Sequence, residues 1–365
     1  MKAPGNTTRR IRFLLGCLLA VLLFVWMGRR TNFGEVTAAM RAISPWAFAG
    51  TLMIIYLSIP LRILQWRALL GPADTPAFGA ITRSLCLGYL GAAVAPTGGS
   101  ELIKTYALSR ASALPFSRIL ASVVVVRIQD LPPVAILAVG AFWLLPASVA
   151  TAHQSVLDAI RLMVVVFAII SGASLGVLLL LAPLRDPLLA VQQRAVARFL
   201  PKAAEVIVSK TNQFVLGLST SDKRRAFGTG QMHAAICWTL FAVAPVPLLL
   251  SLGLNLGQSF MSAIAVVGIA TLVQLVPLTP GGLGTYHLTC VWVLTIMNPQ
   301  MSQSAALAYA VISHLLGMFG PALFGIFALP WGISKVGRLT DVQKSAAELM
   351  EAERPKPLAG QCGNG

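Results

Sequence analysis

The sequence predicts an all-α integral membrane protein, and three observations support this fold class. Hydrophobic residues make up 56% of the 365 residues, charged residues only 11%, and the mean hydropathy is +0.78. A water-soluble domain carries roughly 25% charged residues, so this chain has too few charges to cover itself in water. Apolar runs of the length that crosses a bilayer, about 20 residues, recur along the chain. Much of the surface of the folded chain is therefore expected to face lipid rather than water.

The apolar runs predict about six full membrane spans, the first of which is a signal anchor that remains in place. In chain order these spans cover residues 11–27, 44–65, 118–145, 160–183, 228–252 and 303–330. Aromatic and basic residues at the end of the second span, Arg62, Trp66 and Arg67, indicate an anchor at the membrane interface.

Two further apolar segments are interrupted by proline and glycine. Residues 77–110 contain the break Ala95-Pro96-Thr97-Gly98-Gly99, and residues 258–297 contain the break Pro277-Leu278-Thr279-Pro280-Gly281-Gly282-Leu283-Gly284. Such breaks end helices, and at membrane depth they are tolerated only inside protein or beside a wet cavity. We favour two re-entrant helical hairpins; two pairs of kinked spans remain the alternative.

The distribution of basic residues predicts the orientation. The stretch 184–226 is rich in Lys and Arg, whereas the connections near 146–157, 253–257 and 298–302 contain none. Because cytoplasmic loops collect basic residues, both termini are predicted to be cytoplasmic, in the cytoplasmic (inner) membrane. The two broken segments then enter from opposite sides, which predicts an inverted repeat whose hairpin tips meet near the midplane.

This topology divides the chain into a membrane domain and a tail. Residues 1–334 form the membrane domain, with repeat halves at about 44–145 and 228–330. Between them, about 184–226 is predicted to be a cytoplasmic amphipathic connector on the membrane surface. Residues 335–365 are polar and are predicted to be a largely disordered cytoplasmic tail.

The first break places candidate binding residues around a helix start. Gly98 and Gly99 precede a helix that begins near Ser100, and backbone N–H groups at such a start suit a phosphate or another anion. The following helix is too charged to face lipid. Its candidate substrate-binding side chains are Glu101, Lys104, Tyr106 and Arg110.

Arg127 follows four valines inside an apolar helix, with Asp130 one turn later. A charge inside a membrane is expensive and marks a functional site by default. Both residues are therefore candidates for substrate binding. The alternative is a self-contained pair of Arg127 with Asp130, or an arginine that reaches the interface.

The second break contributes Pro280, Gly281 and Gly282, and two histidines lie in the helices near it. His287 follows the break, and His314 lies in the last span. Each either packs and hydrogen-bonds within the protein or contacts substrate, and histidine titrates near neutral pH.

Several functions are excluded by absent motifs. The chain has no phosphate-binding loop of nucleotide hydrolases, zinc-protease motif, serine-hydrolase elbow or paired-carboxylate site. Its cysteines have no metal-ligand spacing, so neither a metal site nor a cofactor is predicted. The net charge of +16 arises from basic residues between apolar runs, which indicates an anionic membrane surface rather than nucleic acid. The chain is therefore not expected to be an enzyme.

At these motifs the sequence resembles the flippase-like transmembrane domain of lysylphosphatidylglycerol synthases, including the stand-alone YbhN-like members. The matching motifs are Pro96-Thr97-Gly98-Gly99-Ser100-Glu101 with Tyr106 and Arg110, then Arg127 and Asp130, then Pro277 to Gly284. Two positions depart from the family pattern. His287 stands where members usually have Glu, and His314 stands where they often have Arg, so the departures concern the substrate more than the fold.

The resemblance implies translocation of lipids or lipid-linked sugars between leaflets, since the synthase activity belongs to a separate soluble domain. We therefore expect a flippase or transporter of phospholipid or polyprenyl-phosphate-linked substrate, with anionic or lipid-linked headgroups as partners. The alternative is an accessory subunit that recruits or orients a glycosyltransferase or lipid-modifying enzyme through residues 184–226. An intramembrane lipid-modifying enzyme would need a nucleophile or metal set that the sequence lacks.

Overall fold

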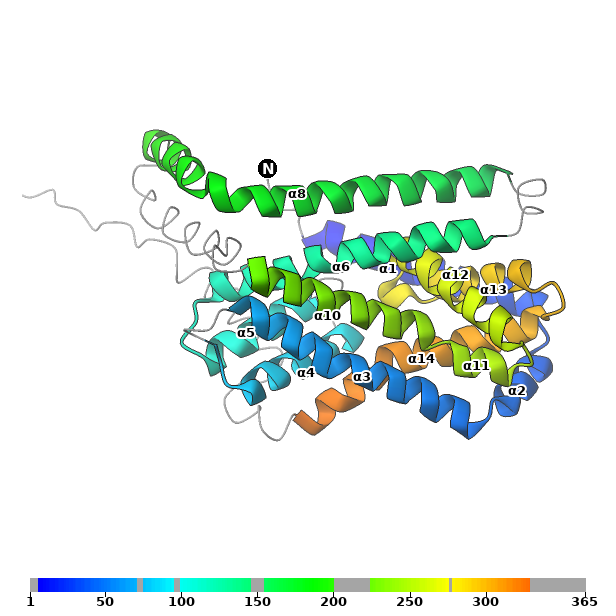
Figure 1. Cartoon of the computed structure of the whole chain (residues 1–365). Coiled ribbons are helices and arrows are strands. Elements are labelled where there is room, and N and C mark those ends of the chain that lie inside the picture. The colour runs from blue at the N-terminus through cyan, green and yellow to red at the C-terminus, as the bar shows by residue number, and fades with distance from the viewer. Residues whose placement is uncertain are drawn as a thin grey trace, which may run out of the picture.

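The computed structural model is an elongated bundle of helices (Figure 1). It describes residues 6–70, 75–94, 99–145, 154–199, 224–275 and 278–328, and within these ranges it contains helices and no strands. The elements are α1 (Asn6–Arg30), α2 (Phe33–Ala42), α3 (Pro45–Leu70), α4 (Phe78–Val94), α5 (Gly99–Ala111), α6 (Phe116–Leu144), α8 (Gln154–Phe199), α10 (Arg224–Val243), α11 (Val246–Ser251), α12 (Leu256–Leu275), the short 3₁₀ turn η3 (Pro280–Gly282), α13 (Thr285–Met297) and α14 (Gln303–Ala328). The predicted all-α fold class is confirmed.

Six segments of these helices are long and apolar enough to cross a membrane, which makes this a multi-pass membrane protein. They are Pro45–Leu70, Phe116–Leu144, Leu157–Leu178, Phe227–Ser251, Leu256–Gln274 and Gln303–Phe324. Five of them coincide with predicted spans.

The other predicted span and the predicted connector differ from expectation. The N-terminal apolar run is part of α1, which joins α2 at a 91° bend and passes the same test only as that bent pair. The α12 helix, expected as one arm of a hairpin, is long enough to span by itself. The α8 helix runs on to Phe199 and so includes the first part of the predicted connector 184–226. Residues 200–223 of the connector and the predicted tail 335–365 lie outside the described residues, and residues 224–226 belong to α10.

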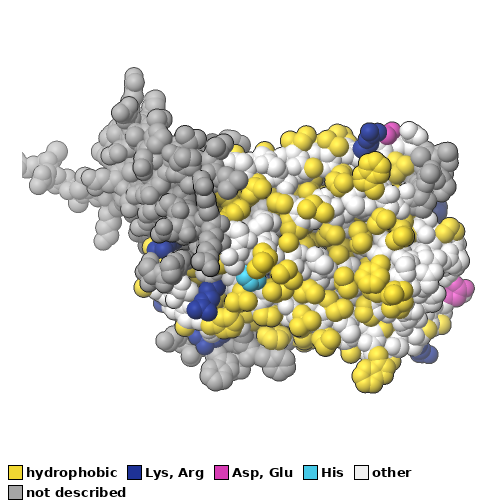
Figure 2. All heavy atoms as spheres, viewed as in Figure 1, with side chains coloured by type: hydrophobic (Ala, Val, Ile, Leu, Met, Phe, Trp, Pro, Cys, Tyr) yellow, Lys and Arg dark blue, Asp and Glu magenta, His cyan; other side chains and the backbone are white. Residues whose placement is uncertain are grey.

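One face of the bundle is apolar between two more polar ends. In Figure 2 hydrophobic side chains cover the middle of the visible face, and the charged side chains gather towards its ends. Two tryptophans are highly exposed near one end: Trp46, where α3 begins, and Trp143, where α6 finishes. Tryptophan is enriched at membrane–water interfaces. We therefore place one interface of the membrane at the level of these two residues.

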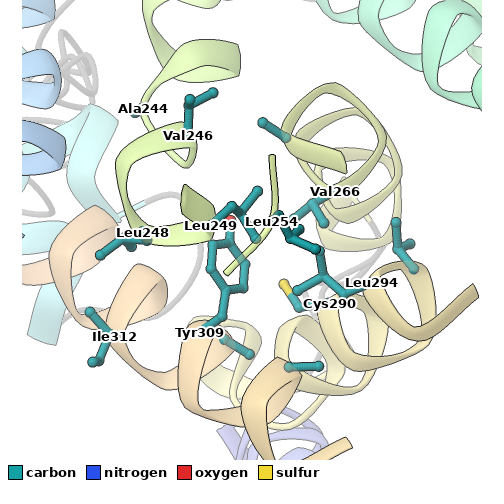
Figure 3. Close-up of a cluster of buried hydrophobic side chains, with 14 of the residues drawn as sticks. Ala244, Val246, Leu248, Leu249, Leu254, Val266, Cys290, Leu294, Tyr309 and Ile312 are labelled. Atoms are coloured by element: carbon teal, nitrogen blue, oxygen red, sulfur yellow. The ribbon is translucent and has the colours of Figure 1, made fainter. Parts of the chain in front are cut away.

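The largest buried cluster lies where α11, α12, α13 and α14 meet. Figure 3 shows Tyr309 of α14 pointing towards Leu249 of α11 and Leu254, with Cys290 and Leu294 of α13 close by. Lipid tails are as apolar as these side chains, so close packing rather than exclusion of water holds such helices together.

Gly268 allows α12 to approach α6 closely. A Cβ at this position would lie 2.6 Å from the Leu137 carbonyl oxygen and 2.7 Å from the Ala141 Cβ. Both atoms belong to the packed interior of α6, so neither can swing away. We expect Gly268→Ala to destabilise the protein by about 1–3 kcal/mol, the usual cost of overpacking.

Thermal unfolding in detergent checks this expectation, with Gly172→Ala as the matched control. Gly172 lies in α8, and a Cβ there meets nothing within 4 Å. The control should unfold at the wild-type temperature or slightly above it, because alanine favours helix more than glycine does. Equal unfolding temperatures for the two variants would show that α12 and α6 are not in close contact.

The two interrupted segments form helical hairpins at opposite ends of the bundle (Figure 1). In the first, α4 and α5 lie against each other, with Gly91 so close to Ile103 that a Cβ would lie 2.5 Å from its Cδ1 atom. In the second, α12 and α13 are joined through η3. Helices of 13 residues, such as α5 and α13, reach about 20 Å, which is less than the bilayer core of about 30 Å. That length favours α5 and α13 as hairpin arms that stop partway across the bilayer. The inverted-repeat relation between the two halves stays a prediction.

Candidate functional site

A cavity of about 660 Å³ lies between the start of α5 and the break of the second hairpin. Ser100 and Glu101, at the start of α5, line it from the first hairpin, and Thr279, Gly281 and Gly282 line it from the second. Side chains of α3, α6, α10, α12, α13 and α14 complete the wall. The hairpins thus lie at opposite ends of the bundle, and residues of both line one cavity. Gly98 lies outside the described residues.

The first wall carries an ion pair between two helices. The Arg127 guanidinium of α6 binds the Glu101 carboxylate of α5, with an Nε–Oε1 distance of 3.0 Å. The same carboxylate lies 4.0 Å from the Lys104 ammonium. Arg127 is nevertheless 58% exposed and lines the cavity. It is therefore the cation that an entering ligand would meet.

A second ion pair lies behind the first. The Asp130 carboxylate accepts a hydrogen bond from Arg62 of α3, and Arg62 also donates to the Gln65 side-chain oxygen at 3.0 Å. The side chains of Arg62 and Asp130 are 11% and 7% exposed. Arg127 lies 3.8 Å from the other Asp130 oxygen. The suggested self-contained pair of Arg127 and Asp130 is thus a minor contact, since each has a shorter bond elsewhere.

The predicted interfacial anchor at the end of the second span is wrong for two of its three residues. The Arg62 side chain is only 11% exposed and is held in the ion pair just described, and Trp66 is 2% exposed and donates to the Ser122 hydroxyl at 2.9 Å. Arg67 alone is exposed. The reason is that α3 continues to Leu70, so Arg62 lies about two turns before the C-terminal end of the helix. An arginine within a predicted span was the signal that would have identified it.

Other predicted residues of the first segment have different surroundings. Gly99 begins α5 next to the cavity, and Lys104 is buried behind Glu101 with its ammonium 5.9 Å from the Trp66 ring centre. Tyr106 is buried and Arg110 is exposed, and neither lines the cavity. Their selection from the motif is not supported by this geometry.

The second wall depends on glycines in the left-handed region. Gly281, Gly282 and Gly284 have φ values of 60°, 71° and 84°, which only glycine adopts readily. His314 of α14 donates from Nε2 to the Gly281 carbonyl at 3.0 Å. The break following Pro280 is therefore a glycine turn whose carbonyl at Gly281 is hydrogen-bonded to His314.

Three stacked or edge-on rings, those of Tyr286, His287 and His314, pack together next to this turn. His287 and His314 have ring centres 4.9 Å apart, and Tyr286 stacks on His314 at 4.7 Å. His287 is buried, and its Nδ1 accepts a hydrogen bond from the Gly284 N–H at 3.4 Å. Of the two histidines, His314 lines the cavity, whereas His287 packs and caps the start of α13.

The cavity also has an aromatic side that the sequence did not reveal. Trp238 and Phe241 of α10 and Tyr309 of α14 line it. The Trp238 Nε1 atom and the Tyr309 hydroxyl are buried with no hydrogen-bond partner among the described residues. Buried polar groups are normally paired, so these two atoms are available to a polar ligand or water. In the sequence they are indistinguishable from ordinary core aromatics.

Six helical segments able to span a membrane, around a cavity that carries Glu101 and Arg127, define a multi-pass membrane protein with a charged candidate site among its helices. No group of three potential metal ligands occurs in the part of the chain that the structure describes. The chain belongs to the family described as the lysylphosphatidylglycerol synthase TM region, which matches residues 13–325. The family predicted from the sequence motifs is confirmed.

Two relatives are similar over most of the chain. One, named glycosyltransferase AglD, from Haloferax volcanii, is 25% identical over 367 residues, which cover 95% of this chain and 58% of the relative. Another, named UPF0104 membrane protein, from Methanothermobacter thermautotrophicus, is 25% identical over 337 residues, which cover 88% of this chain and 93% of the relative. The chain therefore spans little more than half the length of the glycosyltransferase. No solved structure matches the chain.

The comparisons associate this chain with membrane proteins of lipid and glycosyl transfer. The family description names a transmembrane region, which suggests a non-catalytic membrane domain, whereas one relative is named a glycosyltransferase.

Proposed function

We propose that this protein binds the headgroup of a phospholipid or polyprenyl-phosphate-linked lipid in the cavity and moves it between the leaflets of the cytoplasmic membrane. The observation that carries the proposal is the position of Arg127, exposed in a cavity that residues of both hairpins line. A charge at membrane depth is costly unless it is paired or functional. An exposed arginine inside a bundle is suited to a phosphate.

The arrangement of the hairpins supports movement between leaflets. The start of α5 and the second break line one cavity, and the two hairpins lie at opposite ends of the bundle. Opening the bundle at one end while closing the other would expose the same site to each leaflet in turn. The headgroup would occupy the cavity while its acyl chains remain in lipid. The protein would supply no catalytic group.

Filling the cavity tests this proposal. Gly317 of α14 lines the cavity, and a Cβ there meets nothing within 4 Å. A phenyl ring at this position can therefore enter the cavity without displacing the backbone. We expect Gly317→Phe to reduce translocation of a fluorescently labelled phospholipid in proteoliposomes at least about tenfold, because the headgroup loses its space.

Gly172→Phe is the matched control, since Gly172 also has open space around it but lies in α8 away from the cavity. It should translocate lipid at the wild-type rate, and both variants should elute as folded protein. Unchanged translocation with Gly317→Phe, or no translocation by the wild type above lipid-only vesicles for any phospholipid or polyprenyl phosphate, would contradict the proposal.

The glycosyltransferase relative favours a second candidate, in which the membrane region recruits or orients a glycosyltransferase or lipid-modifying enzyme. The chain matches 58% of that relative, so the relative joins a similar membrane region to additional sequence. In this case substitutions in residues 184–226 would abolish glycolipid formation in cells, and Gly317→Phe would leave it intact. The opposite pattern would support transport.

A further inference from the structure

The charged side of the cavity belongs to a connected network of five side chains. The Arg62–Asp130 and Arg127–Glu101 ion pairs form its two centres, and Lys104 lies 4.0 Å from Glu101. Three of these side chains are cations and two are carboxylates, so the network holds one positive charge in excess. Of the five, Glu101 and Arg127 line the cavity, and no other Lys, Arg, Asp or Glu does so among the described residues.

The excess positive charge belongs to the outer half of the network. Arg62 and Asp130 are both nearly buried and are paired with each other. Glu101, by contrast, is shared by Arg127 and Lys104. One carboxylate therefore serves two cations, and the cation that faces the cavity is Arg127.

We infer that the cavity selects a lipid whose headgroup is a phosphodiester with a single negative charge. On binding, this phosphate replaces the Glu101 carboxylate as the ion-pair partner of Arg127. This inference rests on the function proposed above. The planar Arg127 guanidinium offers two parallel N–H groups that match two phosphate oxygens. Once Arg127 binds the phosphate, Glu101 keeps Lys104 as its partner, so every charge remains paired throughout the exchange.

The charge balance explains why a diester suits the site. An uncompensated charge away from water is strongly unfavourable. A diester brings one negative charge and makes the network neutral. A phosphate monoester, with a charge of about −1.5 to −2 near neutral pH, would leave an excess of negative charge. A zwitterionic headgroup would leave the positive charge uncompensated.

A competition experiment with lipids of equal acyl chains tests the inference. The full-length protein is equilibrated in mixed micelles that contain equimolar phosphatidylglycerol, phosphatidic acid and phosphatidylcholine, and the lipids retained on the purified protein are measured by mass spectrometry. The wild type should retain phosphatidylglycerol in at least about tenfold excess over each of the other two, equivalent to one decade in affinity.

Two variants shift the network charge in opposite directions. Glu101→Gln adds one positive charge and should transfer the preference to phosphatidic acid. Lys104→Met removes one and should abolish the preference for phosphatidylglycerol over phosphatidylcholine. Arg67→Gln is the matched control, because Arg67 is exposed on α3 outside the network and its loss should leave the wild-type preference unchanged.

The outcomes separate this inference from the proposed function. Lipid translocation that is blocked by Gly317→Phe, together with no headgroup preference, would overturn the inference and leave transport standing. A wild-type preference that persists in both Glu101→Gln and Lys104→Met would also overturn it. Displacement of bound lipid by an equal concentration of glycerophosphoglycerol, the same diester without acyl chains, would overturn its assignment to a lipid.

Discussion

Asp130→Asn should prevent stable folding, because it leaves the Arg62 guanidinium buried without its counter-charge. The two side chains are 11% and 7% exposed and lie 68 residues apart in the chain. Removing one partner of a buried ion pair costs about 3–5 kcal/mol. That is a large fraction of the 5–15 kcal/mol that typically stabilises a soluble domain. We expect most of the variant to aggregate on extraction into mild detergent, and the remainder to unfold at a lower temperature.

A double replacement distinguishes this explanation from a functional role of Asp130. Arg62→Met with Asp130→Leu removes both charges, and replacing a buried pair by apolar residues is often neutral or stabilising. The double variant should therefore recover monodisperse protein. Asp158→Asn, on the exposed surface of α8, is the control for replacing a carboxylate by an amide. If Asp130→Asn unfolds at the same temperature as Asp158→Asn, the buried pair does not hold α3 to α6.

Arg127→Ala should give the opposite result, a folded protein that does not move lipid. The Arg127 side chain is 58% exposed, and exposed ion pairs contribute about 0.2–1 kcal/mol to stability. Its removal leaves Glu101 with Lys104 as a partner at 4.0 Å. The cavity, however, loses the cation that faces it. We expect translocation in proteoliposomes to fall to the lipid-only rate while the unfolding temperature changes little.

Arg127→Lys and Arg67→Ala refine this test. Lysine keeps the charge but not the planar pair of donors, so Arg127→Lys should translocate at a reduced but measurable rate. Arg67→Ala removes an exposed arginine away from the cavity and should behave as the wild type. Wild-type translocation by well-inserted Arg127→Ala would refute the assignment of Arg127 to substrate binding.

Much of the fold could be predicted because its determinants are local. Spans follow from runs of apolar residues, and the two hairpin breaks follow from proline and glycine within a few positions. The exceptions have identifiable causes. The run 11–27 gives no sign of the 91° bend between α1 and α2, since that bend occurs at an ordinary polar turn. The length of α12 was missed because the segment was interpreted as one hairpin together with its break.

The candidate site was predicted less completely. Glu101, Arg127, Gly281, Gly282 and His314 line the cavity, and each was recognisable as a charge, a polar ring or a glycine inside an apolar segment. Arg110 fitted the same motif but is exposed, because a motif does not specify which face of a helix turns inward. Trp238 and Tyr309 also line the cavity but were not predicted. The sequence around an aromatic residue is apolar whether that residue borders a core or a cavity.

The sequence by itself determined that this is a membrane protein of this family, with two broken hairpins and several charges at membrane depth. These properties depend on composition and on motifs a few residues long. Only the tertiary structure decided which charges meet. Arg62 pairs with Asp130, Glu101 pairs with Arg127, and residues of both hairpins line one cavity. Such pairings depend on how helices distant in the chain pack together, and packing geometry is not encoded in any single segment.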